Sequence, residues 1–305
     1  MEFEGAMYHL LSRGDRRENI FWDDKDRESF LALLGRCCGR TGWQVHAYCL
    51  MSNHFHLVIE TPRANLVAGM KWFLGAYTMR FNRRHRLNGH LFGGRYKSIL
   101  IDDSTPEYLR AACDYVHLNP ARARMVPAEE ALKTYEWSSY PSYLQAERGR
   151  PGWLRCDRLL GEHGLSGGSR RVRREFAART EAQRRLGDEV SNQPLRRGWF
   201  HGAEDYLERL VERLGQIPKP KRGRYRGSPA TDLEVAERIV REGLREFGLQ
   251  ERGLAKLRKS DRRKVAIAHR VREQTAMELR WIGERLAMGG ASNVSNVLRQ
   301  LYSED

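Results

Sequence analysis

Two histidines stand one residue apart in the stretch CLMSNHFHLVIET, which spans residues 49–61. The stretch has the pattern of a β-hairpin, with strands at 43–50 and 54–60 and a turn at 51–53. Because strand positions two apart point to the same face of a sheet, His54 and His56 would share one face and Phe55 the other. Two neighbouring imidazoles can bind a divalent metal ion, although a histidine in a strand is more often a hydrogen-bonded polar residue than a ligand.

Two further polar residues lie on a predicted helix at 104–120, which Pro106 can begin and Pro120 ends. Tyr115 and Asn119 are four residues apart and therefore lie on one face of this helix, at the edge that would meet the two histidines. Two imidazoles and a carboxamide oxygen would form a three-point site for a divalent ion such as Mg²⁺ or Mn²⁺. Taken singly, Tyr115 is more often a half-buried aromatic and Asn119 more often a C-terminal helix cap, and only their combination with the two histidines favours a site. The apolar stripe that would pack this helix on the sheet consists of Leu109, Ala112 and Val116.

The elements that must position these residues follow the order β-α-β-β-α-β and then a helix. The predicted ranges are strands 7–14, 43–50, 54–60 and 96–102, and helices 23–42, 65–85 and 104–120. This order predicts an α+β fold, a ferredoxin-like split β-α-β sandwich with a four-stranded antiparallel sheet. We expect helices on one face and an open second face, a common platform for nucleic acids.

The charge distribution favours a polyanionic partner. The chain has 305 residues and a formal net charge of +15, with no Asp or Glu between residues 61 and 100. A solvated basic face would normally include acids, so we interpret the acid-free stretch as a phosphate-binding surface. Its basic residues are Arg63, Lys71, Arg80, Arg83, Arg84, Arg86, Arg95 and Lys97.

Other sequence features argue against a membrane or secreted protein. No run of about 18 apolar residues predicts a membrane helix, and the N-terminus lacks the pattern of a signal peptide. The five cysteines form no CxxC pair and suit reduced thiols in a cytoplasmic protein.

The chain resembles the HUH-type single-tyrosine transposases of the transposase-17 kind, and among them the REP-associated tyrosine transposases. The matching segments are YHLLSRGDRRENIFWDDKDRESFL, MSNHFHLVIET, LFGGRYKSILID, YVHLNPARARMV and YEWSSY, in the order of the family, across about residues 7–143. The resemblance implies that His54 and His56 are metal ligands, that Tyr115 is the nucleophile and that Asn119 is a third ligand. It also implies single-stranded or hairpin DNA as substrate, with repetitive palindromic (REP) elements as the expected sequence class.

The chemistry implied by this resemblance fits the residue types. A tyrosine hydroxyl keeps its proton at neutral pH and is a weak nucleophile, so the metal would act mainly by polarising and orienting the phosphate. Attack would give a 5′-phosphotyrosine and a free 3′-OH, and a second 3′-OH could then reseal the strand. Arg13, Arg16 and Arg17 follow the first strand and could bind backbone phosphates, or form a solvated loop.

The rest of the chain predicts further modules after a catalytic domain at 1–145. Residues 146–216 read as a linker and helical segment, 217–229 as a basic Pro/Gly tether, and 230–305 as a helical region with a helix-turn-helix. In the latter, a turn at 287–290 separates two helices, and Asn293, Asn296 and Arg299 would face the DNA major groove. The expected core residues are Val271, Leu279, Ile282, Gly283, Leu286, Val294, Val297, Leu298 and Leu301. A helical hairpin for packing or dimerisation is the alternative.

Two other functions remain open from the sequence. A DNA-binding regulator could use the same sandwich and helix-turn-helix without catalysis. A metallohydrolase could use the HxH pair, although such sites usually add a nearby Asp-His pair that HFHLVIET lacks. The sequence also leaves open whether the chain is a monomer or a homodimer.

Overall fold

The computed structural model describes residues 2–186, 195, 198, 200–215, 229–275 and 277–301. The chain forms two compact units, Met1–Gly223 and Arg224–Asp305. The predicted basic tether lies outside the described residues, except for Pro229, which begins a helix. Among the described helices, none has the length and apolar character needed to cross a membrane.

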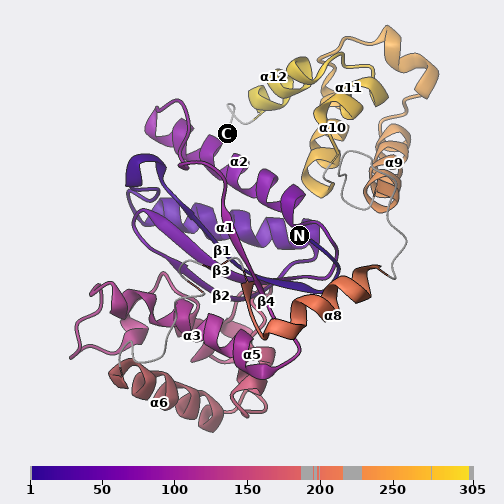
Figure 1. Cartoon of the computed structure of the whole chain (residues 1–305). Helices are drawn as coiled ribbons and strands as arrows, with labels where there is room; N and C mark the ends of the chain where they lie inside the picture. Colours follow the sequence, from indigo (N-terminus) through magenta and orange to yellow (C-terminus); the bar gives the residue numbers. More distant parts are fainter. Residues whose placement is uncertain are drawn as a thin grey trace. The chain divides into compact units, whose positions relative to one another are not determined.

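The first unit is a mixed α and β structure (Figure 1). Its strands are β1 (Ala6–Arg13), β2 (Gln44–Leu50), β3 (His54–Thr61), β4 (Lys97–Ile101) and β5 (Phe200–His201). Its helices are α1 (Asp24–Thr41), α2 (Leu66–His85), α3 (Pro106–Arg122), α4 (Tyr140–Tyr143), α5 (Asp157–Glu162), α6 (Arg170–Leu186) and α8 (Glu204–Gly215). Single 3₁₀ turns lie at Asp15–Arg17, Leu132–Thr134 and Glu147–Gly149.

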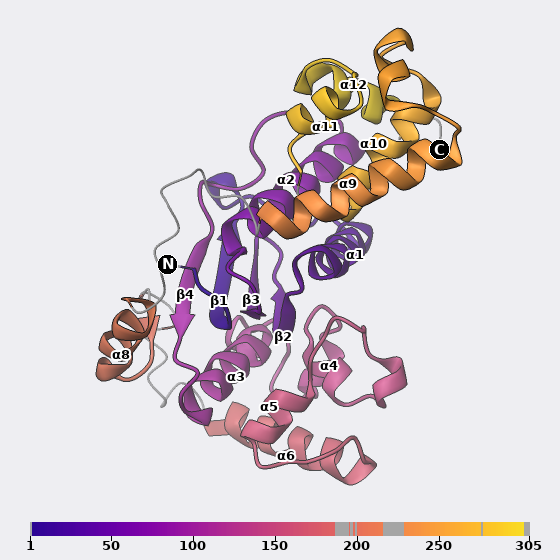
Figure 2. The same cartoon turned by 90° about the vertical axis from the view of Figure 1, so that its right-hand side faces the viewer.

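The sheet has the strand order β2-β3-β1-β4-β5, and Figure 2 shows β4, β1, β3 and β2 side by side. Its first four strands pair antiparallel in the order expected of a split β-α-β sandwich. The prediction of four strands was incomplete, because β5 adds to the edge of β4 in parallel. A two-residue strand has no alternating pattern that a sequence could reveal, and this one is fixed by the backbone bond from Asp102 N to His201 O, 2.9 Å long.

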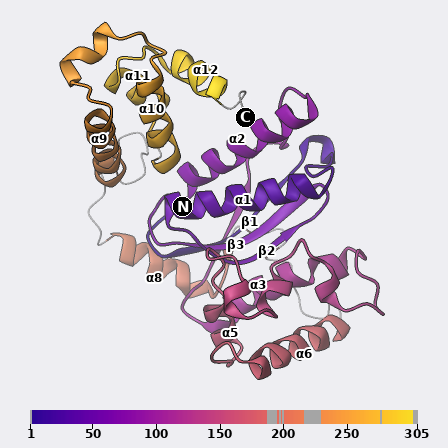
Figure 3. The same ribbon diagram turned by 180° about the vertical axis from the view of Figure 1, so that it is seen from behind.

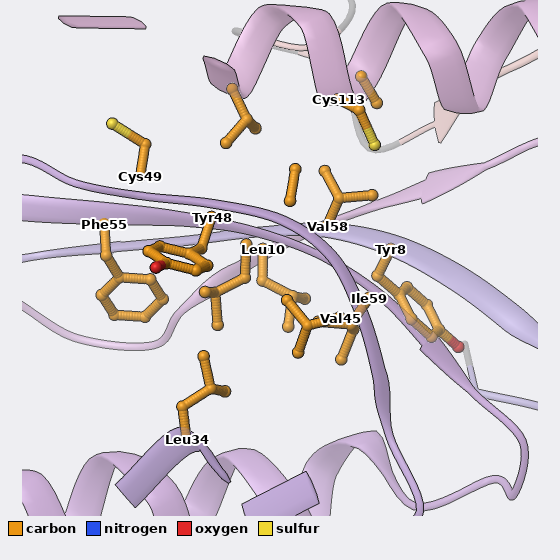
Figure 4. Close-up of a cluster of buried hydrophobic side chains, with 14 of the residues drawn as sticks. Tyr8, Leu10, Leu34, Val45, Tyr48, Cys49, Phe55, Val58, Ile59 and Cys113 are labelled. Carbon is orange, nitrogen blue, oxygen red and sulfur yellow. The ribbon is translucent and has the colours of Figure 1, made fainter. Parts of the chain in front are cut away.

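The two faces of the sheet are covered by different helices, with α1 and α2 on one side and α3 on the other (Figures 1 and 3). The expectation of an open second face was therefore wrong. The apolar stripe of α3 is fully buried and the helix contacts β2, β3 and β4. Figure 4 shows Leu10, Tyr48 and Phe55 on the side of Leu34 in α1, and Cys49 and Val58 on the side of Cys113 in α3. Burial of apolar area on both faces of the sheet stabilises this three-layer arrangement.

The segment at 146–216, predicted as a linker and helical segment, contains the helices α5, α6 and α8, and its described part before α8 packs into the same core. Phe176 in α6 is buried, and its ring stacks on that of Tyr143 with 5.1 Å between the centroids. The N–H of Arg155 donates to the carbonyl of Val45 in β2 at 2.8 Å. The first compact unit thus extends beyond the predicted boundary at 145, because α5 and α6 cover apolar surface that α3 and α4 would otherwise expose.

The second unit is all helical in its described part, with α9 (Pro229–Glu246), α10 (Arg262–Gln274), α11 (Leu279–Arg285) and α12 (Ala291–Leu301), and a 3₁₀ helix at Glu251–Lys256. The turn between α11 and α12 is tight, since a Cβ on Gly283 would lie 2.0 Å from the carbonyl oxygen of Gly289. Lys264 is buried beside this turn, and its ammonium donates to the carbonyls of Leu254 and Ala287 at 3.1 and 2.7 Å.

The predicted core of this unit agrees with the structure where its side chains are described. Val271, Ile282, Gly283, Leu286, Val294 and Leu298 are buried, and Leu279 and Val297 are partly buried. The side chain of Leu301 lies outside the described residues. Two helices joined by a short turn are thus present, and their use in reading DNA stays a prediction.

One close contact within the first unit gives a stability prediction. A Cβ on Gly69 of α2 would lie 2.1 Å from the ring of Trp43, whose Nε1 donates to Asn65 at 2.8 Å. Gly69→Ala should therefore lower the free energy of unfolding by about 1–3 kcal/mol through overpacking. Gly75→Ala, in the same helix but with no atom within 4 Å of a new Cβ, should raise it by about 0.5–1 kcal/mol. Urea denaturation measures the free energy of unfolding of both variants. Equal changes in the two variants would contradict the close packing of Gly69.

Candidate active site

The strand β3 places the two histidines on the face of the sheet that α3 covers. In the strand register His56 lies opposite Leu11 and Cys49, and Cys49 is on the α3 side of the sheet (Figure 4). The rings of His54 and His56 are 5.1 Å apart between centroids. His56 is only 5% exposed, whereas His54, at the start of the strand, is partly exposed. The pair therefore runs from the surface into the interior along one strand.

Tyr115 of α3 lies against the inner histidine. Its ring centroid is 5.8 Å from that of His56, in an edge-to-face arrangement, and the tyrosine is 7% exposed. The Arg122 guanidinium carbon lies 5.0 Å from the centroid of the same ring, and Nη1 of Arg122 donates to the carbonyl of Tyr115 at 3.2 Å. The tyrosine is thus held in a defined position beside an imidazole and a cation.

Asn119 follows Tyr115 by one turn on the same face of α3. It is 8% exposed, and its Nδ2 has no hydrogen-bond partner within the described part of the chain. A buried amide without a partner is costly and typical of a position that a bound molecule completes. The amide could supply an oxygen to a cation or an N–H to a phosphate.

His9 is a residue of this site that the sequence interpretation missed. It is fully buried in β1, and its Nε2 and the Nδ1 of His56 share a hydrogen bond of 2.9 Å. Its ring also meets the ring of Tyr115, with 5.7 Å between centroids. The available signal was the pairing of β1 with β3, because His9 lies on the same face as Leu11, which is opposite His56.

In each histidine of the HxH pair, the Nδ1 atom takes part in a hydrogen bond. The Nδ1 of His54 shares a hydrogen bond of 2.7 Å with the side-chain oxygen of Asn53, while His9 engages the Nδ1 of His56. An Nδ1–H donated to these partners leaves the lone pair on Nε2 available. Second partners of this kind orient metal-binding histidines in many proteins.

Burial keeps these imidazoles neutral. Desolvation, and then the charge of Arg13, lowers the pKa of His54 to about 4. Desolvation, followed by the neighbouring histidines and Arg13, lowers the pKa of His56 well below its ordinary value. Desolvation likewise lowers the pKa of His9 to about 3. Neutral imidazoles are the form that binds metal ions, so the two histidines fit a divalent ion. Within the described residues no group of three His, Cys, Asp or Glu side chains forms a metal site, so further ligands would include an amide, water or substrate oxygen.

A loop carrying two arginines is attached next to His54. The main chain of Arg16 and Arg17 has φ values of 50° and 64°, which are uncommon for residues with a Cβ. Asn53 holds this loop, because its Nδ2 donates to the carbonyl of Arg17 at 2.9 Å. Arg13 pairs with His54 in the strand register. The predicted cluster of Arg13, Arg16 and Arg17 is thus exposed beside the outer histidine.

The acid-free stretch at 61–100 has acidic neighbours in the folded structure, which come from another part of the sequence. Arg84 forms ion pairs with Asp23 and Asp26, and His85 approaches Asp26 at 2.9 Å. Arg84 thus has carboxylate partners that α1 supplies to the end of α2, and its contact with DNA phosphates stays a prediction. Arg80, Arg83 and Lys97 also take part in interactions within the protein, while Arg86 and Arg95 are exposed.

The predicted DNA-reading residues of the second unit have different surroundings. Asn293 donates from Nδ2 to the carbonyl of Met288 at 2.6 Å, so its side chain closes the turn before α12. Asn296 is exposed, and the side chain of Arg299 lies outside the described residues. The side chain of Asn293 is thus hydrogen-bonded within the fold and partly exposed, Asn296 is exposed, and contact of either residue with DNA stays a prediction.

Comparison with known proteins gives one family. The model of the family described as "Transposase IS200 like" matches residues 2–119, a range that includes His54, His56, Tyr115 and Asn119. No curated protein matches the chain. A solved structure of a REP-associated tyrosine transposase bound to a REP hairpin is similar over 47% of this chain and 82% of that chain, with 14% sequence identity and a TM-score of 0.39.

Proposed function

We propose that the chain, whose residues 2–119 match the model of the family described as "Transposase IS200 like", cleaves and rejoins single-stranded or hairpin DNA through Tyr115. The observation that carries the proposal is the edge-to-face contact of Tyr115 with His56, at 5.8 Å between centroids. It joins a nucleophile of α3 to the HxH pair of β3, although the two lie far apart in sequence.

The proposed reaction exchanges one ester bond for another. The hydroxyl oxygen of Tyr115 attacks a DNA phosphorus, a bond between that oxygen and phosphorus forms, and the bond from phosphorus to the 3′ oxygen breaks. The tyrosine gives up its proton and the departing 3′ oxygen gains one. A 5′-phosphotyrosine and a free 3′-OH result, so the reverse attack by another 3′-OH can reseal the strand without an external energy source.

The surrounding residues would fix the geometry of this attack. His54 and His56 would hold a divalent ion such as Mg²⁺ or Mn²⁺ through their Nε2 atoms, with the Asn119 oxygen as a further ligand. Such an ion, when bound, supplies charge that polarises a phosphate oxygen. Arg122 contacts the tyrosine ring at 5.0 Å and would restrain it, which limits the entropy lost on reaching the reactive geometry.

The burial of Tyr115 favours a flexible strand as substrate. Because the residue is 7% exposed, a flexible single strand can bring a phosphate to its hydroxyl more readily than a rigid duplex can. A net charge of +15 favours phosphate-rich ligands. Transposition of DNA is the biological role that this activity would serve, with palindromic elements of the REP type as the proposed substrates. We also propose that the protein acts in the cytoplasm, where its cysteines would stay reduced.

A denaturing-gel assay tests this function directly. Wild-type protein is incubated with Mg²⁺ and a panel of hairpin oligonucleotides carrying a 5′ or a 3′ label, and covalent protein–DNA adducts are counted. The proposal is supported if the 3′ label becomes attached to the protein, because the fragment on the 3′ side of the cut would be linked to Tyr115. The other fragment should then end in a free 3′-OH. Tight binding of the whole panel without any adduct would favour a non-catalytic regulator, and free 5′-phosphate products would favour a metallohydrolase.

Salt dependence should separate arginines that hold phosphates from arginines that hold the fold. Replacing Arg16, Arg17 or Arg86 singly with Ala should lower the slope of log K against log salt by about 0.7 on single strands. Arg84→Ala should leave the slope unchanged and lower the melting temperature, because Arg84 already neutralises Asp23 and Asp26. Anisotropy titrations at several salt concentrations measure both. An Arg84 variant with the reduced slope would mean that DNA displaces its carboxylate partners.

A further inference from the structure

A cavity of about 520 Å³ lies at the end of the helix that carries the tyrosine. Its walls come from the last turn of α3, the following loop at 123–128 and the end of α6. Its volume is within the range of about 300–1,000 Å³ that is usual for small-molecule sites. Part of its wall is apolar, formed by Leu118, Val126 and Pro127.

The cationic part of the wall is continuous with the candidate active site. Tyr115, Asn119 and Arg122 stand at spacings of four and three residues and so share one face of α3. Arg122 contacts the ring of Tyr115 and also lines the cavity. A strand that passes Tyr115 along this face therefore reaches the cavity next.

The loop at 123–128, which forms one wall of the cavity, is held in place by α6. Arg184 of α6 also lines the cavity, and it donates to the carbonyls of Val126, Pro127 and Glu130 at 3.0, 2.6 and 2.7 Å. Arg184 is thereby used within the protein. Arg124 is exposed, with a main-chain φ of 57° that fixes it in a tight turn. No acidic side chain is among the described residues that line the cavity.

We propose that this cavity, defined by Leu118, Arg122, Arg124, Val126 and Pro127, binds one unpaired nucleotide of the DNA strand that flanks the phosphate attacked by Tyr115. The inference rests on the proposed function and adds a specific subsite to it. The base lies against the apolar wall, and its phosphate meets the exposed guanidinium group of Arg124. Apolar walls and arginine planes are surfaces on which bases stack, and the absence of acids from the described lining suits a phosphate.

The test compares two labelled 20-mers of equal charge, oligo(dT) and a strand of abasic residues, bound to the full chain in excess chelator. Ala128 lines the cavity and is exposed, whereas Tyr115 is not among the lining residues, so Ala128→Trp is expected to fill the cavity and leave Tyr115 in place. This variant should reduce the preference for oligo(dT) over the abasic strand by roughly fivefold or more, the loss expected for one stacked base. Ala146→Trp, also exposed but outside the cavity, should keep the wild-type preference.

Arg124→Gln supplies a second arm that requires no bulky side chain. It should weaken the binding of both strands equally and lower the salt slope by about 0.7, whereas Arg148→Gln, an exposed control, should do neither. The subsite would be overturned if Ala128→Trp melted like wild type and kept the wild-type preference for oligo(dT). It would also be overturned if the salt slope of Arg124→Gln equalled that of wild type. Failure of the proposed function would give a different result. The wild-type protein would form no covalent adduct, but Ala128→Trp would still have a reduced preference for oligo(dT) over the abasic strand.

Discussion

Tyr115→Phe should abolish the covalent protein–DNA adduct while leaving the affinity for DNA nearly unchanged. The substitution removes one hydroxyl and keeps the ring that contacts His9, His56 and Arg122. Loss of an enzyme nucleophile typically lowers the rate by at least about a thousandfold. No adduct should therefore appear on a denaturing gel over the time in which the wild type reacts completely.

The matched control for this experiment is Tyr108→Phe. Tyr108 lies two turns earlier in α3, and its ring faces His201 at 5.1 Å between centroids. This variant should form the adduct at the wild-type rate. An adduct that persists in Tyr115→Phe and disappears in Tyr108→Phe would move the nucleophile to the other end of the helix and invalidate the proposed site.

The second large effect concerns the histidine pair. His54→Ala and His56→Ala should each lose cleavage and weaken the binding of Mn²⁺ to the protein without DNA, measured by calorimetry or paramagnetic resonance. Asn119→Ala should be milder, because a water molecule can replace an amide oxygen. His90→Ala, at an exposed position outside the site, should behave as wild type. Full cleavage by the wild type in excess chelator would rule out a metal ion.

The partners of the two histidines extend this prediction. Asn53→Ala and His9→Phe remove the groups that engage Nδ1 of His54 and of His56. Loss of such partners typically costs about 10–100-fold in metal affinity. His9→Gln keeps an amide oxygen that can accept from His56 and should recover part of the loss. Equal affinity in His9→Phe and His9→Gln, with both melting like wild type, would show that His9 only fills space.

Local periodicity was enough to predict the main elements and the residues singled out on them. The alternation of β3 puts His54 and His56 on one face, and the helical spacing of α3 puts Tyr115 and Asn119 on one face. Both patterns follow from covalent geometry, with periods of 2.0 and 3.6 residues, and so can be read without knowing the fold. The order of strands and helices likewise predicted the antiparallel pairing of the first four strands.

Tertiary structure decided which partners these residues meet. His9 reaches His56 across 47 positions of sequence, and Arg84 meets Asp26 across 58. In the same way Phe176 of α6, in the predicted linker and helical segment, packs on Tyr143 and makes that segment part of the core. Such contacts depend on strand order and on which helix covers which face, and neither property is encoded in a short window of residues. The sequence by itself therefore determined the chemical groups and their faces, while the packing of α1, α3 and α6 decided which charges are neutralised and which imidazoles are oriented.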